Sequence, residues 1–367
     1  MDSTPTYDVA NLVAWLGFLL AFIFGYVANK TSFCTMGAVS DVVNMGDWGR
    51  MRAWLLGIAI AILGTAVLVY LGDLRVSETY YTRGPFHWLA FLVGGLTFGI
   101  GMTLGSGCGQ RTLVRLGGGN LKSVVVFLFM GYFALVSMNG ILRVFTDTFL
   151  RADIFTLYLG SDQSLPSVLG YSGGMSHLVV AGVLALAIIV FVFASKEFRS
   201  SADNMLAGAV VGLVVAAGWY VTAKLGYQED PETMEMVYMG TASKLAESMT
   251  FVGPLANTMD LWAYWTDKTM NFGIATVFGV VIGSFIYSVF NKSFRWEYFT
   301  SPQDMFRHLI GAALMGYGGV TALGCTIGQG VTGVSTLALG SFVALFGIIA
   351  GAAATMKIQY YLLMRDA

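Results

Sequence analysis

Long runs of uncharged, mostly apolar residues recur along the chain, separated by short polar segments. A helix that spans a membrane needs about 20 predominantly apolar residues. An uncharged run of much greater length, Leu309–Met356, is too long for one helix, and we divide it at its glycine-rich middle, Gly324–Gly333. With this division we expect about nine spans. The other runs are Asn11–Asn29, Ala53–Gly72, Trp88–Ser106, Ser123–Leu142, Leu178–Ser195, Met205–Ala223 and Thr269–Asn291.

The composition agrees with a membrane protein. Charged residues make up 11% of the chain and hydrophobic residues 56%, whereas a soluble domain carries about 25% charged residues. The net charge of -1 argues against a nucleic-acid partner, which requires a basic stripe. We therefore predict an all-α polytopic membrane protein that forms one membrane domain, residues 1–367, in contact with membrane lipid, and that is not an enzyme.

The distribution of Lys and Arg predicts the orientation of the chain. The segment Met1–Ala10 has no Lys or Arg, so it does not resemble a secretory signal. We interpret the first apolar run as a permanent helix. Cytoplasmic loops carry an excess of Lys and Arg, and this rule favours an outer N-terminus and an inner C-terminus. The long acidic loop Gly226–Lys268 then lies outside.

Glycines and one cysteine repeat at a single offset. A shift of 217 residues places Gly94 on Gly311, Gly99 on Gly316, Gly101 on Gly318, Gly107 on Gly324 and Cys108 on Cys325. The shift moves the chain by five spans, an odd number, so the two halves must be inverted. Inverted repeats are common in transporters, with the site at the repeat interface near the midplane. We expect the halves at residues 1–150 and 176–367.

All three cysteines, Cys34, Cys108 and Cys325, lie at breaks between apolar runs. If they only packed as small hydrophobic side chains, we would expect them inside the runs. Irregular backbone at membrane depth is tolerated where protein buries it or where it lines a watery cavity. Helix N-termini at such breaks attract anions, and thiols suit a soft atom such as sulfur. We expect Cys108 and Cys325 to approach each other, with Cys34 further along the same path.

Flanking residues complete the candidate site. Arg111 and Arg115 follow Cys108 closely and would supply positive potential, although charges at these positions are also ordinary cytoplasmic flanks. No metal site or cofactor is expected, because the cysteine spacing gives no zinc or redox pattern and the histidines are scattered. The candidate path residues are Cys34, Cys108, Cys325, Gly107, Gly109, Gly324, Gln329, Arg111 and Arg115.

At these residues the chain resembles the YeeE/YedE-type bacterial sulfur transporters, which include thiosulfate permeases. The most specific motifs are Gly107-Cys108 followed by Leu113–Gly119, and the segment Gly324–Gly330. The resemblance implies uptake of thiosulfate across a bacterial inner membrane through an hourglass-shaped protein with the cysteines in its path. It also implies a small TusA-like sulfur-carrier partner in the cytoplasm. The chain departs from the family pattern at Arg111.

Other functions are open at this point. A membrane thiol–disulfide or sulfur-relay protein would also use intramembrane cysteines, but exchange requires a close pair, and none is close in sequence. A neutral-solute channel would not need cysteine, and a structural subunit would bind no ligand. Energy coupling is also open, because a dianion imported into a negative interior works against about 4.6 kcal/mol per 100 mV. No Asp or Glu within the apolar runs stands out as a proton carrier, and the residues do not distinguish thiosulfate from sulfite, sulfide or selenium species.

Overall fold

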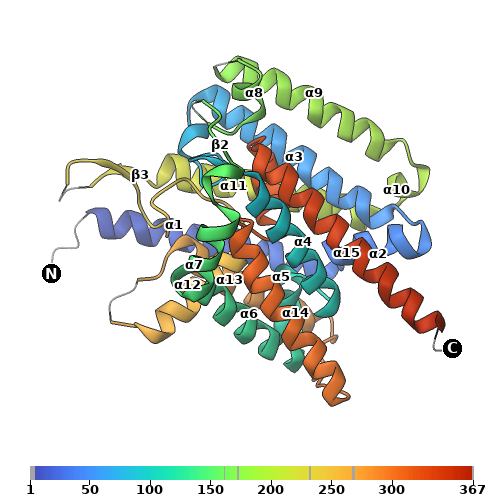
Figure 1. Cartoon of the computed structure of the whole chain (residues 1–367). Helices are drawn as coiled ribbons and strands as arrows, with labels where there is room; N and C mark the ends of the chain where they lie inside the picture. The colour runs from blue at the N-terminus through green and yellow to red at the C-terminus, as the bar shows by residue number, and fades with distance from the viewer. Residues whose placement is uncertain (1–4, 161, 172, 231–232, 267–268, 366–367) are drawn as a thin grey trace.

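The protein is described by a computed structural model that covers residues 5–160, 162–171, 173–230, 233–266 and 269–365. The described residues are mostly helical (Figure 1). The longer helices are α1 (Pro5–Lys30), α3 (Gly49–Leu71), α4 (Trp88–Leu104), α6 (Leu121–Asn139), α9 (Gly174–Phe193), α11 (Ala202–Tyr220), α13 (Phe272–Phe290), α14 (Pro302–Thr321) and α15 (Leu339–Arg365).

Short elements join the long helices. The short helices are α2 (Thr35–Met45), α5 (Gly109–Gly117), α7 (Ile141–Phe145), α8 (Leu165–Val168), α10 (Lys196–Ser200) and α12 (Val252–Ala263), and the 3-10 and π turns are η1 (Val76–Glu78), η2 (Thr146–Leu150), η3 (Asp153–Phe155), η4 (Val221–Leu225) and η5 (Gly328–Gly333). Two small antiparallel hairpins pair β1 (Phe86–His87) with β2 (Thr156–Leu157) and β3 (Tyr227–Glu229) with β4 (Met236–Tyr238).

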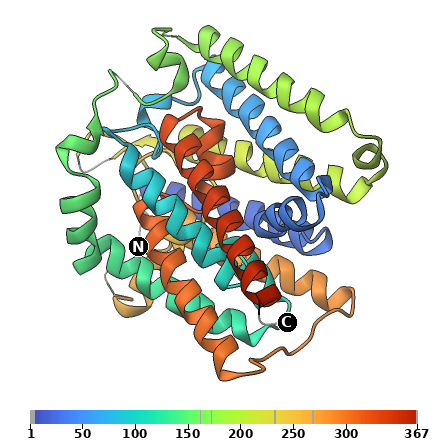
Figure 2. The same ribbon diagram turned by 45° about the vertical axis from the view of Figure 1, so that its right-hand side comes forward.

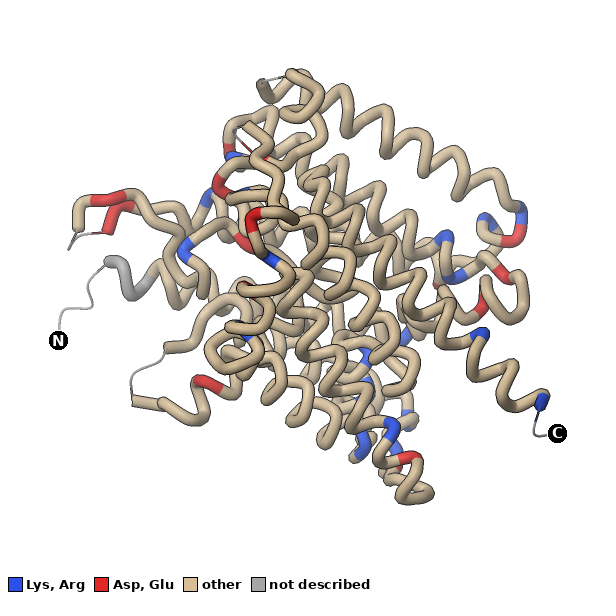
Figure 3. The backbone as a smooth tube through the Cα atoms, viewed as in Figure 1, with Lys and Arg blue, Asp and Glu red and all other residues tan. Residues whose placement is uncertain are grey.

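Among the described residues, eight helical segments are long and apolar enough to cross a membrane. The expected ninth span corresponds to α14, which has 20 residues but carries Asp304, Arg307 and His308 in its first two turns. The all-α polytopic fold is thus confirmed. The start of α1 and the end of α15 lie at opposite ends of the helix bundle (Figure 1). Lys and Arg are densest toward the end of the bundle where α15 finishes (Figure 3).

Each pair of packed long helices has a counterpart when the first part of the chain is matched to the second. Helix α1 packs against α13 and α3 against α11, while α4 packs against α15 and α6 against α14. Helices α4 and α14 also cross each other, and α15 lies beside α4 (Figure 2). Two inverted halves would produce this pattern, so it supports the predicted repeat, in which α1 to α6 would correspond to α11 to α15.

Glycines allow the backbones of α4 and α14 to touch. A Cβ added to Gly101 would lie 2.7 Å from the carbonyl oxygen of Gly311, and one added to Gly311 would lie 2.7 Å from that of Gly101. In the same way, a Cβ added to Gly94 would lie 2.9 Å from the carbonyl oxygen of Gly318, and one added to Gly318 would lie 2.6 Å from that of Gly94. These four glycines were aligned by the 217-residue shift, which maps one contact onto the other. Small residues are typical of helix contacts in membranes because they allow close approach.

Helix α9 lies at the edge of the bundle, where it packs mainly on α3 (Figure 1). Its outer side chains Val179, Val183, Leu186 and Val190 are exposed and recur with helical spacing. In a membrane this apolar stripe faces lipid.

The predicted outer loop Gly226–Lys268 is not a simple external segment. Residues 231–232 and 267–268 of this loop lie outside the described residues, but the part around Ala246, Met249 and Phe251 is fully buried against the helices. Ala246 pairs with the segment before α4, where the amide of Tyr80 donates to its carbonyl oxygen at 3.2 Å. The loop thereby reaches the centre of the protein and contributes to the site described next.

Candidate functional site

The three breaks that carry the cysteines have the same backbone. Two residues before each cysteine, Ser32, Ser106 and Leu323 adopt positive φ angles of 52°, 54° and 60°. The amide of the next residue donates back to a carbonyl five positions earlier, at 3.0, 3.0 and 2.7 Å. This pairing with a left-handed residue is the Schellman ending of a helix, which satisfies carbonyls that would otherwise lack partners. The chain can therefore end a helix inside the protein without leaving these groups unpaired.

Cys34 and Cys108 each directly precede a short helix, and Cys325 lies three residues before η5. Cys34 is the N-cap of α2, and its sulfur accepts a hydrogen bond from the amide of Gly37 at 3.4 Å. The sulfur of Cys325 accepts from the amide of Gly328 at the same distance. Cys108 is the N-cap of α5, and its thiol instead lies 3.8 Å from Oε1 of Gln110.

The folding of the chain brings the Cys34 and Cys108 thiols close together. The Cys34 and Cys108 side chains are close enough to interact directly, and the Cys108 thiol also lies beside Thr326, the neighbour of Cys325. All three cysteines are free and buried, with exposed fractions of 8, 0 and 0%. The closeness of Cys34 and Cys108 was not predicted from the sequence.

Polar groups beside the cysteines lack ordinary partners. The hydroxyls of Thr35 and Thr326, which directly follow Cys34 and Cys325, are buried and form no hydrogen bond to nitrogen or oxygen among the described residues. Oε1 of Gln329 is likewise buried without a partner there, while its amide group donates to the carbonyl of Ala322. A buried polar group without a partner costs free energy, so these groups are suited to contact a polar ligand.

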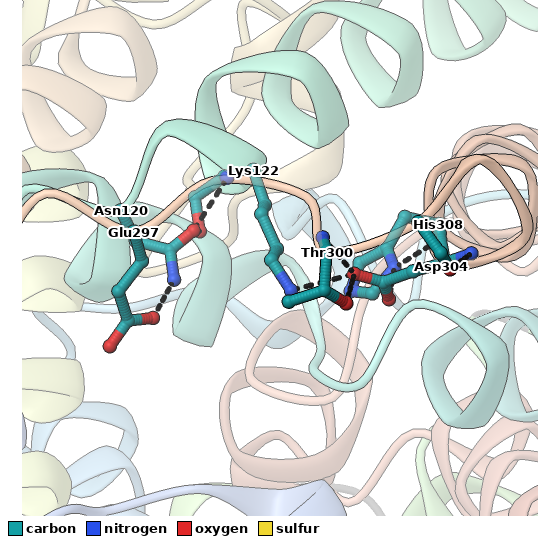
Figure 4. Close-up of polar contacts among 8 residues, drawn as sticks. Asn120, Lys122, Glu297, Thr300, Asp304 and His308 are labelled. Carbon is teal, nitrogen blue, oxygen red and sulfur yellow. Dashed lines mark hydrogen bonds and ion pairs between the residues drawn. The ribbon is translucent and has the colours of Figure 1, made fainter.

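A charged cavity of about 520 Å³ lies next to the Cys108 break. Its charged lining residues are Arg111, Arg115, Lys122, Arg295, Glu297 and Asp304, and His308 also lines it. Figure 4 shows how its acidic groups are engaged: Asp304 contacts Lys122 at 2.7 Å and His308 at 3.1 Å, and Glu297 accepts from Asn120. Lys122 is the main cause that lowers the pKa of Asp304. Cations therefore outnumber carboxylates in this cavity.

Arg115 connects this cavity to the cysteine break. Its guanidinium donates to the carbonyl oxygen of Ser106 at 2.8 Å. Arg111 lies nearby, with its Cγ 3.3 Å from a Cβ placed on Gly107. Both predicted arginines thus line the cavity, beside the break that follows α4.

A second cavity, of about 140 Å³, lies beside the Cys325 break. Leu323 and Gly324 line it, together with the aromatic pair Tyr80 and Tyr81 and the carboxylate of Glu247. The charged cavity includes the first turns of α14, whereas this cavity adjoins its last turn. A helix of 20 residues is about 30 Å long. The two cavities therefore lie at opposite ends of α14, one beside the Cys108 break and the other beside the Cys325 break.

The predicted glycines flank the breaks closely. A Cβ on Gly324 would lie 3.0 Å from Cγ of Gln329, and a Cβ on Gly109 would lie 3.5 Å from the terminal methyl of Met130. Among the described residues, no group of three or more His, Cys, Asp or Glu side chains could hold a metal ion.

The structure adds site residues that the sequence did not reveal. Gln110 donates through Nε2 to the carbonyl of Phe33 at 3.2 Å, and so links the Cys108 break to the Cys34 break. Its position two residues after Cys108 was the available signal. Thr35 and Thr326 could have been found as hydroxyls next to cysteines, but Glu247 lies in a polar loop 78 residues before Cys325 and gave no signal.

Comparisons with known proteins agree with this arrangement. The sulphur transport family model matches residues 30–354. The thiosulfate transporter TsuA of Spirochaeta thermophila is 25% identical over 345 residues, which cover 92% of this chain and 96% of that protein. The thiosulfate transporter TsuA of Escherichia coli K12 is 24% identical over 349 residues, which cover 91% of each chain. Both relatives are transporters, as expected for a chain that is not an enzyme. The chain belongs to the sulphur transport family, and the resemblance seen in its cysteine motifs is confirmed.

Proposed function

We propose that the protein imports thiosulfate, or a closely related sulfur-containing anion, along a path lined by Cys34, Cys108 and Cys325. The observation that carries this proposal is the position of the thiols. They lie at three matching helix breaks, of which the Cys108 break adjoins one cavity and the Cys325 break adjoins another at the opposite end of α14. Two named thiosulfate transporters align with more than nine-tenths of the chain, which supports the choice of anion.

The chemistry of the path suits an anion that has both sulfur and oxygen atoms. Thiols are weak donors that suit a soft, polarisable sulfur. The free hydroxyls of Thr35 and Thr326 would donate to the oxygens, as would backbone amides at the start of α2 and α5. Successive sites that each bind weakly allow an ion to move on. Sulfate has no soft terminal atom, so the thiols would favour thiosulfate over sulfate.

We propose that the charged cavity opens to the cytoplasm, with the N-terminus in the periplasm and the C-terminus in the cytoplasm of a bacterial inner membrane. The excess of Lys and Arg at that end supports this orientation. The cationic lining, which includes Arg111 and Arg115, would draw the anion inward from the cysteines. The same opening is where a small TusA-like sulfur carrier would dock. Residues 1–150 and 176–367 would form the two inverted halves, with membrane lipid around them.

The contact between Cys34 and Cys108 supports a second candidate, a sulfur relay through thiols. In such a relay one thiolate attacks the outer sulfur of thiosulfate, which forms a persulfide and releases sulfite. The neighbouring thiol can then attack the inner sulfur of the persulfide, which forms a Cys34–Cys108 disulfide and releases sulfide. A relay predicts a covalent adduct or a reducible Cys34–Cys108 disulfide during turnover. Mass spectrometry of protein quenched with a thiol-alkylating reagent during uptake would detect either one, and unmodified thiols throughout would exclude the relay.

Uptake of radiolabelled thiosulfate into proteoliposomes tests the main proposal. We expect saturable uptake that excess unlabelled thiosulfate abolishes and that the same concentration of sulfate inhibits weakly. Empty liposomes and liposomes with a Cys108→Ala variant serve as controls. Equal inhibition by sulfate would contradict a path selective for soft sulfur, and absence of thiosulfate uptake by the purified protein would refute the function.

A further inference from the structure

The cavity beside Cys325 holds one carboxyl group, that of Glu247. This residue belongs to the loop between η4 and α12, which folds back into the protein next to the segment before α4. Tyr80 and Tyr81 also line this cavity, as does Gly324, which directly precedes Cys325. An anion that enters this cavity meets a wall that includes Glu247.

The loop holds Glu247 in a defined position. Its carboxylate accepts hydrogen bonds from the amide of Ser243 at 2.9 Å and from the Ser243 hydroxyl. Its backbone amide donates to Oγ1 of Thr222 at 3.2 Å, and Thr222 donates back to its carbonyl oxygen at 2.5 Å. Its own loop therefore holds the side chain, and η4 holds the backbone.

No cation among the described residues neutralises Glu247. Lys224 pairs with Asp73 at 2.7 Å and Arg75 pairs with Glu78 at 3.2 Å, while Lys244, three residues before Glu247 in the same loop, has an exposed side chain. Glu78, the partner of Arg75, also accepts a hydrogen bond from the hydroxyl of Tyr238. The titratable groups that interact with Glu247 are Tyr80 and Tyr81; Arg151 acts on Tyr80, and Cys325 acts on Tyr81.

Burial shifts the pKa values of Tyr80, Tyr81 and Glu247 and so affects which of them is charged. Burial raises the pKa of Tyr80 to about 12, and it raises the pKa of Tyr81 further above its ordinary value, so both phenols stay neutral. Burial also raises the pKa of Glu247, against the opposing effect of its hydrogen bonds from Ser243 and Ala242. A raised pKa brings the titration of a carboxyl group closer to neutral pH.

We propose that Glu247 is a proton-binding site that controls access of the anion to the cavity beside Cys325. This inference rests on the proposed function. The ionised carboxylate repels an anion in the confined cavity, whereas the protonated acid is neutral and can donate a hydrogen bond to it. One proton moves from the solution to the carboxylate, no other bond changes, and the anion then binds. A dianion and this proton together carry one negative charge, which halves the electrical work of the step.

Thermodynamic linkage gives the sign of the effect. If protonation of Glu247 favours anion binding, then anion binding favours protonation by the same factor. Below the pKa of Glu247 the apparent KM should be constant. Above it, the KM should rise by up to about tenfold per pH unit, because an increasing fraction of the protein carries the repelling carboxylate.

The test measures the KM of thiosulfate uptake in proteoliposomes as a function of pH on the side of this cavity. We expect the wild type to lose affinity as pH rises, E247Q to keep a low KM at every pH, and E247D to retain a pH dependence. E229Q removes an exposed carboxylate in β3 and should behave like the wild type. Glutamine can still accept the Ser243 hydrogen bonds, so E247Q should fold, and its level in the membrane checks this.

A second measurement is independent of transport. Infrared difference spectra of the purified protein between mildly acidic and mildly alkaline buffer should show a protonated-carboxyl band that E247Q lacks and that added thiosulfate strengthens. A wild-type pH profile in E247Q, or identical infrared bands in the two proteins, would overturn the inference while leaving thiosulfate transport in place. Absence of uptake by the wild type at every pH would instead refute the proposed function, and the infrared titration would still decide whether Glu247 binds a proton.

Discussion

Serine and alanine variants of Cys34 and Cys325 should separate the capping role of these side chains from their role in transport. In both cases the sulfur accepts a hydrogen bond from an amide three residues later, at 3.4 Å. Serine is a preferred N-cap residue, whereas replacement of a capping side chain by alanine costs about 0.5–2 kcal/mol. Sulfur is a weak acceptor, so the alanine variants should lose an amount near the lower end of that range. The serine variants should be as stable as the wild type or slightly more stable.

Transport should follow a different order. Serine keeps a donor of similar size but lacks the soft sulfur, so both variants should impair passage of a sulfur anion. If the thiol contact contributes about 1.4 kcal/mol to the limiting step, uptake falls about tenfold. We therefore expect the order of stability to be serine, cysteine, alanine, and the order of uptake to be cysteine far above serine and alanine.

Two measurements on each variant test this reasoning. Thermal unfolding in detergent gives the stability, and thiosulfate uptake normalised to the amount of protein in the membrane gives the activity. Cys108 provides a comparison within the chain, because its thiol contacts Gln110 at 3.8 Å and caps no amide. Its alanine variant should lose uptake with a smaller loss of stability. Near-normal uptake in the serine variants, with loss only in the alanine variants, would show that capping is the essential role and would refute the sulfur contact.

Three further predictions follow from the charges, the helix crossing and the orientation. Arg111→Gln or Arg115→Gln should raise the apparent KM for thiosulfate, more at low than at high ionic strength because salt screens exposed charges; equal effects at all salt concentrations would indicate a packing role. Gly101→Ala places a Cβ 2.7 Å from the α14 backbone and should destabilise the protein by about 1–3 kcal/mol, whereas Gly182→Ala in α9 meets nothing within 4 Å and should be neutral or stabilising in thermal unfolding. A tag inserted next to the exposed Met234 should be accessible from the periplasm and a C-terminal fusion from the cytoplasm, and the reverse labelling pattern would overturn the orientation.

Hydrophobic length predicted most of the helices because a span must be apolar over the thickness of a bilayer. The run Trp88–Ser106 corresponds closely to α4 (Trp88–Leu104), and the division at Gly324–Gly333 falls between α14 and α15. Helix α14 differs because its first turns are polar. Asp304 and His308 lie in the charged cavity there, so this end of the helix does not need apolar side chains.

The site was predictable only in part, since its contacts join distant segments of the chain. Helix breaks at the cysteines followed from the glycine-rich gaps between apolar runs. The contact between Cys34 and Cys108, and the bond from Gln110 to Phe33, depend on how α2 and α5 pack. Glu247 was missed for a similar reason: its loop reads as polar and external, but backbone pairing with the segment before α4 folds it inward.

The reciprocal glycine contacts between α4 and α14 have a consequence for the temperature dependence of transport. Backbones in direct contact leave no side chains that could compress or repack, so this crossing would act as a rigid centre. Rocking of one half against the other occurs on the microsecond-to-millisecond timescale, whereas side-chain rotations take picoseconds to nanoseconds. If only side chains move around a rigid centre, thiosulfate flux should rise gently with temperature, as it does in a channel, and should respond little to the fluidity of the bilayer.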